Sequence, residues 1–245
     1  MALGVLITIT LGCIAWSLWI RRLAWTCRHE VALTLNVALQ GAALALMSPL
    51  ASETLGHWLH SLTGAWNVED ALGHDCYLVA ASAFVYAALS RLGDDDMLRD
   101  RFKLVVEYPL VACLSFLALA FCLGNGAKVY HPDFFRVPSD FWLAAYWVVL
   151  NAMLIHLVLY GVRALRVLRS DPRSRRLADL YLLAGAGGML ACVIHIATAL
   201  VPGLAPSAAA SFAVWLPACV CAASLAIVSA TVWRHRTRPL ELPFG

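Results

Sequence analysis

Polar side chains are rare in the long apolar stretches of this chain, and those present are the first candidates for chemistry. Asn36 and Gln40 stand four residues apart, so on a helix they share one face. Asn151 and His156 lie on a second apolar stretch, and His195 lies on a third. Polar groups inside a membrane are expensive and often mark a ligand site or an ion path. The sequence therefore predicts a ligand-binding or pore-lining cluster of these five side chains.

The same residues have a simpler structural interpretation. Hydrogen bonds between membrane helices contribute about 0.6 kcal/mol each and hold neighbouring helices together. Asn36, Gln40 and Asn151 are all suited to that role. The sequence leaves both interpretations open.

Three histidines form a second group of candidates, for a metal. His57 and His60 are three residues apart and would share a helical face, and His74 follows in the next apolar stretch. Imidazole ligands suit zinc or a similar divalent ion, so these three side chains are a candidate metal site. Scattered histidines in a solvated loop are the simpler interpretation. Haem would need two axial histidines at one depth on facing helices, and only His74 with His195 fits that condition. The expectation is no cofactor, with haem and a divalent metal as alternatives.

Motifs for common enzyme chemistries are missing from the sequence. There is no Walker A loop, no GxSxG elbow and no HExxH helix. The last apolar stretch has no lysine for a Schiff base. We therefore expect a protein that is not an enzyme.

The composition decides which solvent surrounds the elements that carry these residues. Of the 245 residues, 62% are hydrophobic and only 13% are charged, against about a quarter charged in soluble domains. The net charge of +3 comes without a basic tail or zinc-finger spacing, so no nucleic-acid partner is expected. The charges fall in short clusters between apolar stretches, which indicates a lipid bilayer as the surroundings.

Seven of these stretches are long enough to cross a bilayer. A spanning helix needs roughly 20 apolar residues, at about 1.5 Å each, for a hydrocarbon layer of about 30 Å. We therefore predict an all-α transmembrane bundle over residues 1–233 and a short tail over residues 234–245. The predicted spans are residues 2–20, 31–50, 72–92, 104–123, 141–162, 180–201 and 208–233.

The basic residues give these spans an orientation. Sixteen of the 18 lysines and arginines follow the first, third, fifth or seventh span, and only Lys128 and Arg136 lie in the alternate connections. Cytoplasmic loops carry the excess of Lys and Arg. The N-terminus is thus predicted outside and the C-terminus in the cytoplasm, in a cell membrane, with a bacterial inner membrane the expected location.

The connection after the fifth predicted span holds the densest basic cluster. Such a surface on the cytoplasmic side is a candidate docking site for a cytoplasmic protein partner. Its arginines are Arg163, Arg166, Arg169, Arg173, Arg175 and Arg176.

Two stretches carry a resemblance to known membrane proteins. One is the Arg21-Arg22 turn after a short first helix, and the other runs from Tyr160-Gly161-Val162-Arg163 through Arg176 into a Gly-rich sixth helix. Over nearly its whole length the chain resembles an actinobacterial family of uncharacterised seven-helix membrane proteins that are usually labelled transporters. It is also similar to the seven-helix sensor regions that precede bacterial histidine kinases. Members of both kinds often continue into a cytoplasmic domain, so the resemblance implies that any output module here is a separate partner.

These observations give three functional hypotheses. The first is a receptor or sensor module that acts through a cytoplasmic partner. The second is a small-solute or ion transporter or channel, and the third is a structural or interaction protein of the membrane.

Overall fold

The structure of the chain is a computed structural model. It describes residues 2–28, 30–92, 95–172, 175–201 and 207–237, with only the backbone described for residues 95–98. Within these ranges the chain forms helices and no strand, as predicted. Six helices are long and apolar enough to cross a membrane, and the number rises to seven if one bent pair counts as a single span.

The long helices follow the predicted spans in order along the chain, and they differ mainly at their ends. The helices α8 and α10 continue beyond the predicted ends at Val162 and Trp233, because arginine and other straight-chain residues sustain a helix outside the apolar layer. The long helices are α1 (Ala2–Ile20), α2 (Val31–Leu46), α5 (Val68–Leu89), α7 (Tyr108–Leu123), α8 (Phe141–Leu168), α9 (Arg175–Leu200) and α10 (Ala208–Thr237).

Short elements complete the described chain. Two π-helical turns, Ser52–Gly56 and Lys103–Glu107, continue directly into the helices that follow them. The remaining elements are α3 (Pro49–Ala51), α4 (His57–Thr63), α6 (Asp95–Phe102) and the 3-10 turns Arg22–Thr26 and Phe134–Arg136.

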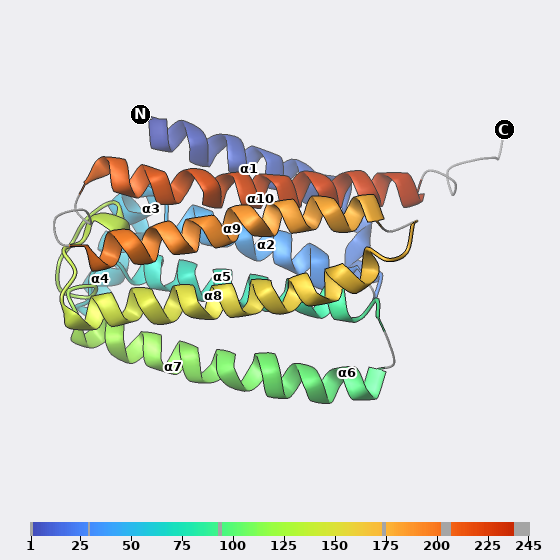
Figure 1. Cartoon of the computed structure of the whole chain (residues 1–245). Coiled ribbons are helices and arrows are strands. Elements are labelled where there is room, and N and C mark those ends of the chain that lie inside the picture. The colour runs from blue at the N-terminus through green and yellow to red at the C-terminus, as the bar shows by residue number, and fades with distance from the viewer. Residues whose placement is uncertain (1, 29, 93–94, 173–174, 202–206, 238–245) are drawn as a thin grey trace.

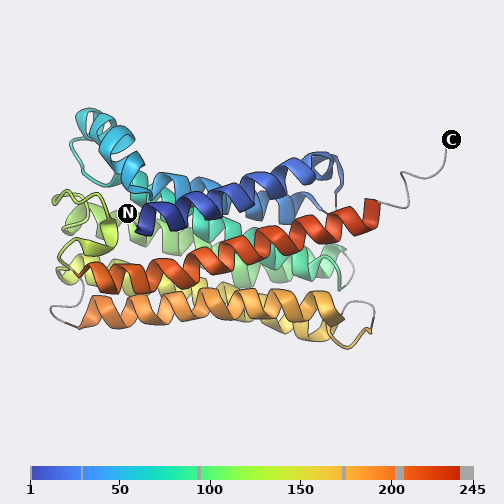
Figure 2. The same ribbon diagram turned by 90° about the horizontal axis from the view of Figure 1, so that it is seen from above.

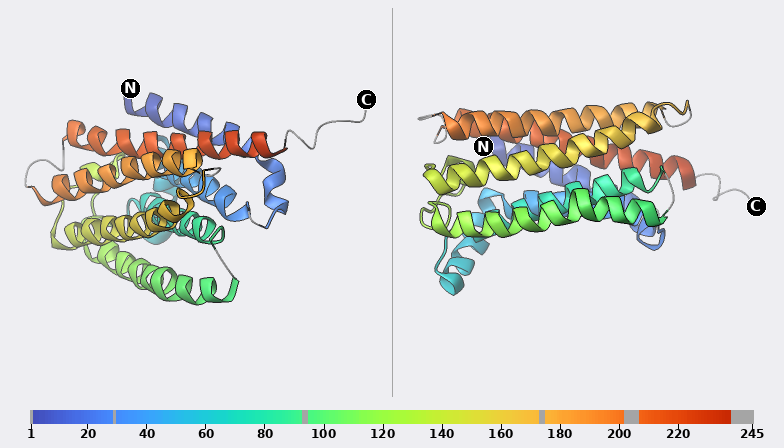
Figure 3. Two further views of the ribbon diagram at one scale, coloured as in Figure 1. Left: turned by 45° about the vertical axis from the view of Figure 1, so that its right-hand side comes forward. Right: turned by 60° about the horizontal axis from the view of Figure 1, so that its bottom comes forward.

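The second predicted span, residues 31–50, is wrong at its end. Helix α2 stops at Leu46, and at about 24 Å its 16 residues fall short of the hydrocarbon thickness. Ser48 is extended (ψ 146°), Pro49 starts the next helix, and the Ser48 hydroxyl accepts a hydrogen bond from the Ala51 N–H at 3.2 Å. The chain then stays helical to Thr63 with a bend of 57°, where the sequence predicted a connecting loop. This bent segment projects away from the bundle (Figures 2 and 3).

Six of the long helices form a closed ring. Each packs on the next in the order α1, α2, α5, α8, α9 and α10, and α10 returns to α1. Helix α7 lies outside this ring, against α8 and α5 (Figure 1). Residues at the inner face of the ring therefore come from segments far apart in the sequence.

The two ends of the bundle differ in chemistry. At one end lie the α1–α2, α5–α6 and α8–α9 connections and the end of α10, with most of the arginines; we call this the basic end (Figure 1). At the other lie α3, α4, the α7–α8 connection and the start of α10, with Glu69, Asp70, Asp133 and Asp140; we call this the acidic end. Helix α1 begins at the acidic end and α10 finishes at the basic end.

Helix α5 also begins earlier than the predicted residue 72. Asn67 has a left-handed conformation (φ 55°) before its first turn, and its side-chain amide donates to the carbonyls of Gly126 and Val129 at 2.7 and 2.8 Å. These bonds tie the α7–α8 connection to α5. As a result Glu69 and Asp70 lie within the helix and are buried, rather than in a solvated loop.

Candidate functional site

A cavity of about 140 Å³ lies inside the ring of helices, between α2, α5, α8, α9 and α10. At roughly 30 Å³ for each water molecule, it holds about five waters or a solute of about five non-hydrogen atoms. Its wall is mostly apolar, and polar side chains reach it from α2, α5, α8 and α9. These side chains are Asn36, Gln40, His74, Tyr77, Asn151 and His195.

The two polar residues of α2 are linked as their spacing predicts. The Asn36 side-chain amide donates to the carbonyl of Ala80 on α5 at 2.7 Å. The Gln40 amide donates to the Asn36 side-chain oxygen at 3.0 Å. Asn36 thus links α2 to α5 through one hydrogen bond and orients the Gln40 side chain at the cavity wall through another.

The pair across the cavity is Asn151 on α8 and His195 on α9. The Asn151 amide nitrogen donates to the Trp147 carbonyl at 2.7 Å and lies 3.3 Å from Nδ1 of His195. An amide nitrogen only donates, so His195 Nδ1 accepts and the ring proton is on Nε2. His195 is therefore neutral in this arrangement.

Helix α5 contributes two polar atoms that have no hydrogen-bond partner among the described residues. Nδ1 of His74 lies 2.9 Å from the Tyr146 hydroxyl, but its Nε2 is buried and unpaired. The hydroxyl of Tyr77 is buried and unpaired as well. Most buried polar groups in proteins are bonded to protein or water, so these two atoms offer hydrogen bonds that a polar molecule in the cavity would use.

Aromatic rings pack around the two histidines of the cavity. Phe135, from the α7–α8 connection, has its ring centroid 4.6 Å from His195 and 6.1 Å from His74. Trp147 contacts the same two histidines at 4.3 and 5.2 Å. The pair proposed for haem thus lines one cavity, but its volume is well below the 300–1,000 Å³ of typical ligand pockets. The described residues do not fit a haem.

His156 does not belong to the cavity cluster, contrary to the prediction. It is five residues from Asn151, which corresponds to about 140° around a helix, and it is exposed on the outer side of α8. Its Nε2 donates to the carbonyl of Val105 at 3.0 Å. Pro109, four residues after Val105, has no N–H and cannot donate the usual helical hydrogen bond to the Val105 carbonyl. His156 donates to this carbonyl instead.

The three histidines of the proposed metal site are not brought together. His60 stacks on Trp66 at 3.5 Å, and His57 meets the edge of the same ring at 5.3 Å. His74 instead lines the cavity. Among the residues that the structure describes, no group of three or more His, Cys, Asp or Glu side chains is arranged to hold a metal ion.

The acidic end contains buried carboxylates that lie outside the predicted spans. Asp133 accepts from the Ser211 hydroxyl at 2.6 Å and from the Trp215 ring nitrogen at 3.4 Å, which links the α7–α8 connection to α10. The Ser52 hydroxyl donates to Asp70 at 3.4 Å.

Tyr130 lies beside these carboxylates, outside the long helices. Partial burial, and then the negative charges of Glu53, Glu69 and Asp70, raise the pKa of the Tyr130 hydroxyl.

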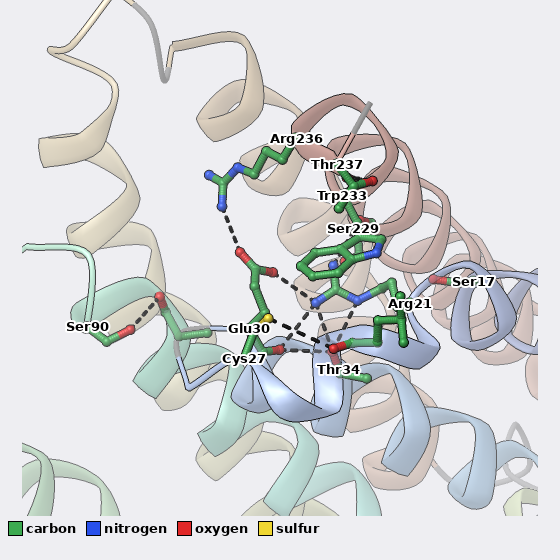
Figure 4. A network of polar contacts seen from close by, with 12 residues as sticks. Ser17, Arg21, Cys27, Glu30, Thr34, Ser90, Ser229, Trp233, Arg236 and Thr237 are labelled. Atoms are coloured by element: carbon green, nitrogen blue, oxygen red, sulfur yellow. Dashed lines mark hydrogen bonds and ion pairs between the residues drawn. The ribbon is translucent and has the colours of Figure 1, made fainter. Parts of the chain in front are cut away.

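The basic end contains a buried ionic network centred on Arg21 (Figure 4). Arg21 is fully buried and donates to the Ser229 carbonyl at 2.9 Å, to the Thr34 hydroxyl at 2.9 Å and to the Glu30 carboxylate at 3.0 Å. Arg236, near the end of α10, donates to the other Glu30 oxygen at 2.7 Å. The sequence did not predict this burial of Arg21, which was counted among the topological charges and in the Arg21-Arg22 turn. One signal was available, since Glu30 and Thr34 are four residues apart and share a helix face.

The arginines predicted to dock a partner lie along an exposed surface of this end. The five that the structure describes are all exposed, and Arg169 pairs with Asp179 at 2.6 Å. Arg173 lies outside the described residues. The five exposed ones are Arg163, Arg166, Arg169, Arg175 and Arg176.

The structure therefore brings Asn36, Gln40, Asn151 and His195 together and adds His74 and Tyr77. Both additions belong to a stripe on α5 at positions 74, 77, 81 and 84, a spacing that marks one helix face and was visible in the sequence. No protein-family model, curated protein or solved structure matches this chain.

Proposed function

We propose that this chain is a non-enzymatic multi-pass membrane protein of the receptor type, which binds a small neutral polar ligand in the central cavity. The observation that carries the proposal is the convergence of six uncharged polar side chains on one cavity in the bundle. A charged ligand would have no counter-ion there, because no Asp, Glu, Lys or Arg among the described residues lines the cavity.

The ligand's size follows from the cavity. About five non-hydrogen atoms fit, and at no more than about 1.5 kcal/mol per atom the binding free energy stays below roughly 8 kcal/mol. The dissociation constant is then micromolar or weaker. Small amides and alcohols, which both donate and accept hydrogen bonds, match the unpaired His74 and Tyr77 atoms.

The binding test is a thermal-unfolding screen of the purified protein in detergent micelles. Acetamide and ethylene glycol are the neutral probes, and acetate and methylammonium are ions of similar size. A neutral probe at ten times its dissociation constant is expected to stabilise the fold by about 1.4 kcal/mol, while the ions have no effect. Stabilisation by the ions alone would contradict the proposal.

Tyr77→Phe is the most informative variant for this site. It removes a hydroxyl that has no partner among the described residues, so we expect the fold to be kept. Binding of the neutral probe should weaken by several-fold, the worth of one hydrogen bond. His156→Leu on the outer side of α8 is the control and should bind as the wild type does. Equal binding by all three proteins would exclude the cavity as the site.

The proposal includes seven spans, with the bent pair of α2 and α3–α4 counted as one, an external N-terminus and a cytoplasmic basic end. Epitope tags at the two ends test it directly in spheroplasts. The N-terminal tag should bind antibody in intact spheroplasts, and the C-terminal tag only after permeabilisation. Tags on the same face would show that the number of spans is wrong.

A signal would leave through the exposed arginines of the α8–α9 region, which offer docking to an acidic cytoplasmic protein. Helices α8, α9 and α10 line the cavity and continue to the basic end, so they connect the two regions. Replacing Arg163, Arg166, Arg169, Arg175 and Arg176 by Gln is expected to abolish co-purification of such a partner and to leave probe binding unchanged.

The bent helix pair favours a second candidate, a small-solute transporter. Broken helices beside a central site are common in transporters, usually in pairs. Here α2, which bears Asn36 and Gln40, breaks at Ser48–Pro49, and it is the one such pair among the described residues. Flux of labelled acetamide into proteoliposomes, above that of protein-free vesicles, would favour transport over sensing.

A further inference from the structure

A second cavity, of about 330 Å³, opens at the basic end. Its walls come from the ends of five helices: Glu30 before α2, Arg91 after α5, Leu168 of α8, Tyr181 of α9 and Arg236 of α10. It is therefore formed only in the folded bundle and is distinct from the central cavity.

The charges around this cleft do not balance. Arg21, Arg91 and Arg236 all approach the carboxylate of Glu30, at 3.0, 3.5 and 2.7 Å respectively. Asp171 also lines the cleft, whereas Arg21 is fully buried and reaches Glu30 from behind the lining. The lining residues therefore balance in charge, and the buried Arg21 brings the formal charge of the five groups to +1, which an anion in the cleft would neutralise.

Hydrogen bonding is incomplete in the same place. The two oxygens of Glu30 accept from Arg21 and Arg236. Nη2 of Arg91, although only 3.5 Å from Glu30, is buried and has no hydrogen-bond partner among the described residues. The unpaired Nη2 of Arg91 thus lies near a second arginine, Arg236. Two N–H donors of a guanidinium group can bind two oxygens of one phosphate, so this arrangement favours a phosphate group.

The remaining wall is apolar and comes from Leu165, Leu168 and Leu177. Arginines above an apolar wall, at the end of a helix bundle, match the boundary between the headgroups and the acyl chains of a bilayer. Basic pockets between membrane helices at the cytoplasmic side are known to bind phospholipid headgroups.

We propose that this cleft binds the phosphate group of an anionic phospholipid, with Arg91 and Arg236 as its ligands. The lipid would join the ends of α5 and α10, where Arg91 and Arg236 already share Glu30 as a partner. The proposal rests on the membrane-spanning part of the proposed function and is independent of the ligand of the central cavity.

The experiment titrates the detergent-solubilised protein with dioctanoyl phosphatidylglycerol, dioctanoyl phosphatidylcholine or inorganic phosphate, and follows the unfolding temperature. Phosphatidylglycerol is expected to raise it saturably, and phosphatidylcholine is not. Arg91→Gln and Arg236→Gln should each raise the half-saturating concentration about fivefold, the effect of one basic residue at a lipid headgroup. Arg169→Gln is the matched control, because Arg169 lies at the same end but outside the cleft, and it should behave as the wild type.

Three results would overturn the proposal. Equal stabilisation by both lipids would show that headgroup charge is not recognised. An equal loss in Arg169→Gln and the two cleft variants would show diffuse attraction to the surface. A full shift with inorganic phosphate alone, with no addition from the lipid, would assign the cleft to free phosphate. If Arg91→Gln does not fold, Arg236→Gln decides alone, because the Arg236 side chain is 53% exposed. Failure here leaves the tag-accessibility and acetamide experiments unaffected, so the two proposals are tested separately.

Discussion

Replacing Arg21 by methionine is the sharpest test of the fold's energetics. The side chain is fully buried, and its guanidinium bonds Thr34, Ser229 and Glu30, groups that belong to the α1–α2 region and to α10. Breaking a buried ion pair by removing one partner costs about 3–5 kcal/mol. Glu30 keeps Arg236 at 2.7 Å, so its charge stays compensated and the lower limit applies. We expect Arg21→Met to lower the free energy of unfolding by about 3 kcal/mol.

The assay is unfolding by SDS titration in mixed micelles, followed by circular dichroism. Arg22→Met is the matched control, because Arg22 is the next residue, is exposed, and is 5.1 Å from the Trp19 ring. That contact is worth at most about 1 kcal/mol at an exposed site. If Arg21→Met and Arg22→Met unfold at the same SDS concentration, the buried network does not hold the basic end together.

A double-mutant cycle separates the pair from the rest of the network. Arg21→Met with Glu30→Leu is expected to be less destabilised than the sum of the two single variants, with a coupling of about 1–3 kcal/mol. Additive effects would mean that Arg21 acts through its other partners and not through Glu30.

Two further predictions concern helix packing. His156→Leu should destabilise the fold by about 1 kcal/mol in the same SDS assay, because the Val105 carbonyl loses its donor; no loss would mean that the bond contributes nothing. Gly73→Ala should lower the free energy of unfolding by about 1–3 kcal/mol, because its new Cβ would lie 2.5 Å from the Met47 side chain. Gly12→Ala is the control, because a Cβ there meets open space, and it should be neutral or stabilising by up to about 1 kcal/mol. If Gly12→Ala were the more destabilised of the two, the packing of α2 on α5 would be contradicted.

Prediction from sequence succeeded where the property is local. The length of an apolar stretch and the arginines that follow it are properties of consecutive residues. The helical fold class and the order of the long helices were therefore predicted correctly from the sequence. Helix ends were less accurate. Helices α8 and α10 continue past the apolar stretch, and α2 ends at Leu46 because Ser48 and Pro49 start a new helix there.

The candidate site was predicted in part. Asn36 and Gln40 share a face by their spacing, and the structure turns that face toward the cavity. Asn151 and His156 were grouped, although five residues place them about 140° apart on a helix, and only Asn151 lines the cavity. This error was avoidable, because the angle follows from the sequence alone.

Other features depended on how the helices pack. Whether His74 joins His57 or His195 is a question of which helices are neighbours, and the ring order of α5, α8 and α9 answers it. Likewise, the shared face of Glu30 and Thr34 does not show which of the two adjacent arginines will meet it, and only the packing makes Arg21 buried and Arg22 exposed. The sequence by itself determined that the helices are apolar, in which order they follow one another and which connections carry positive charge, because each property belongs to a single stretch of chain. Only the tertiary structure decided which polar groups meet, because a cavity and an ion pair depend on contacts between segments up to about two hundred residues apart, such as Arg21 with Ser229.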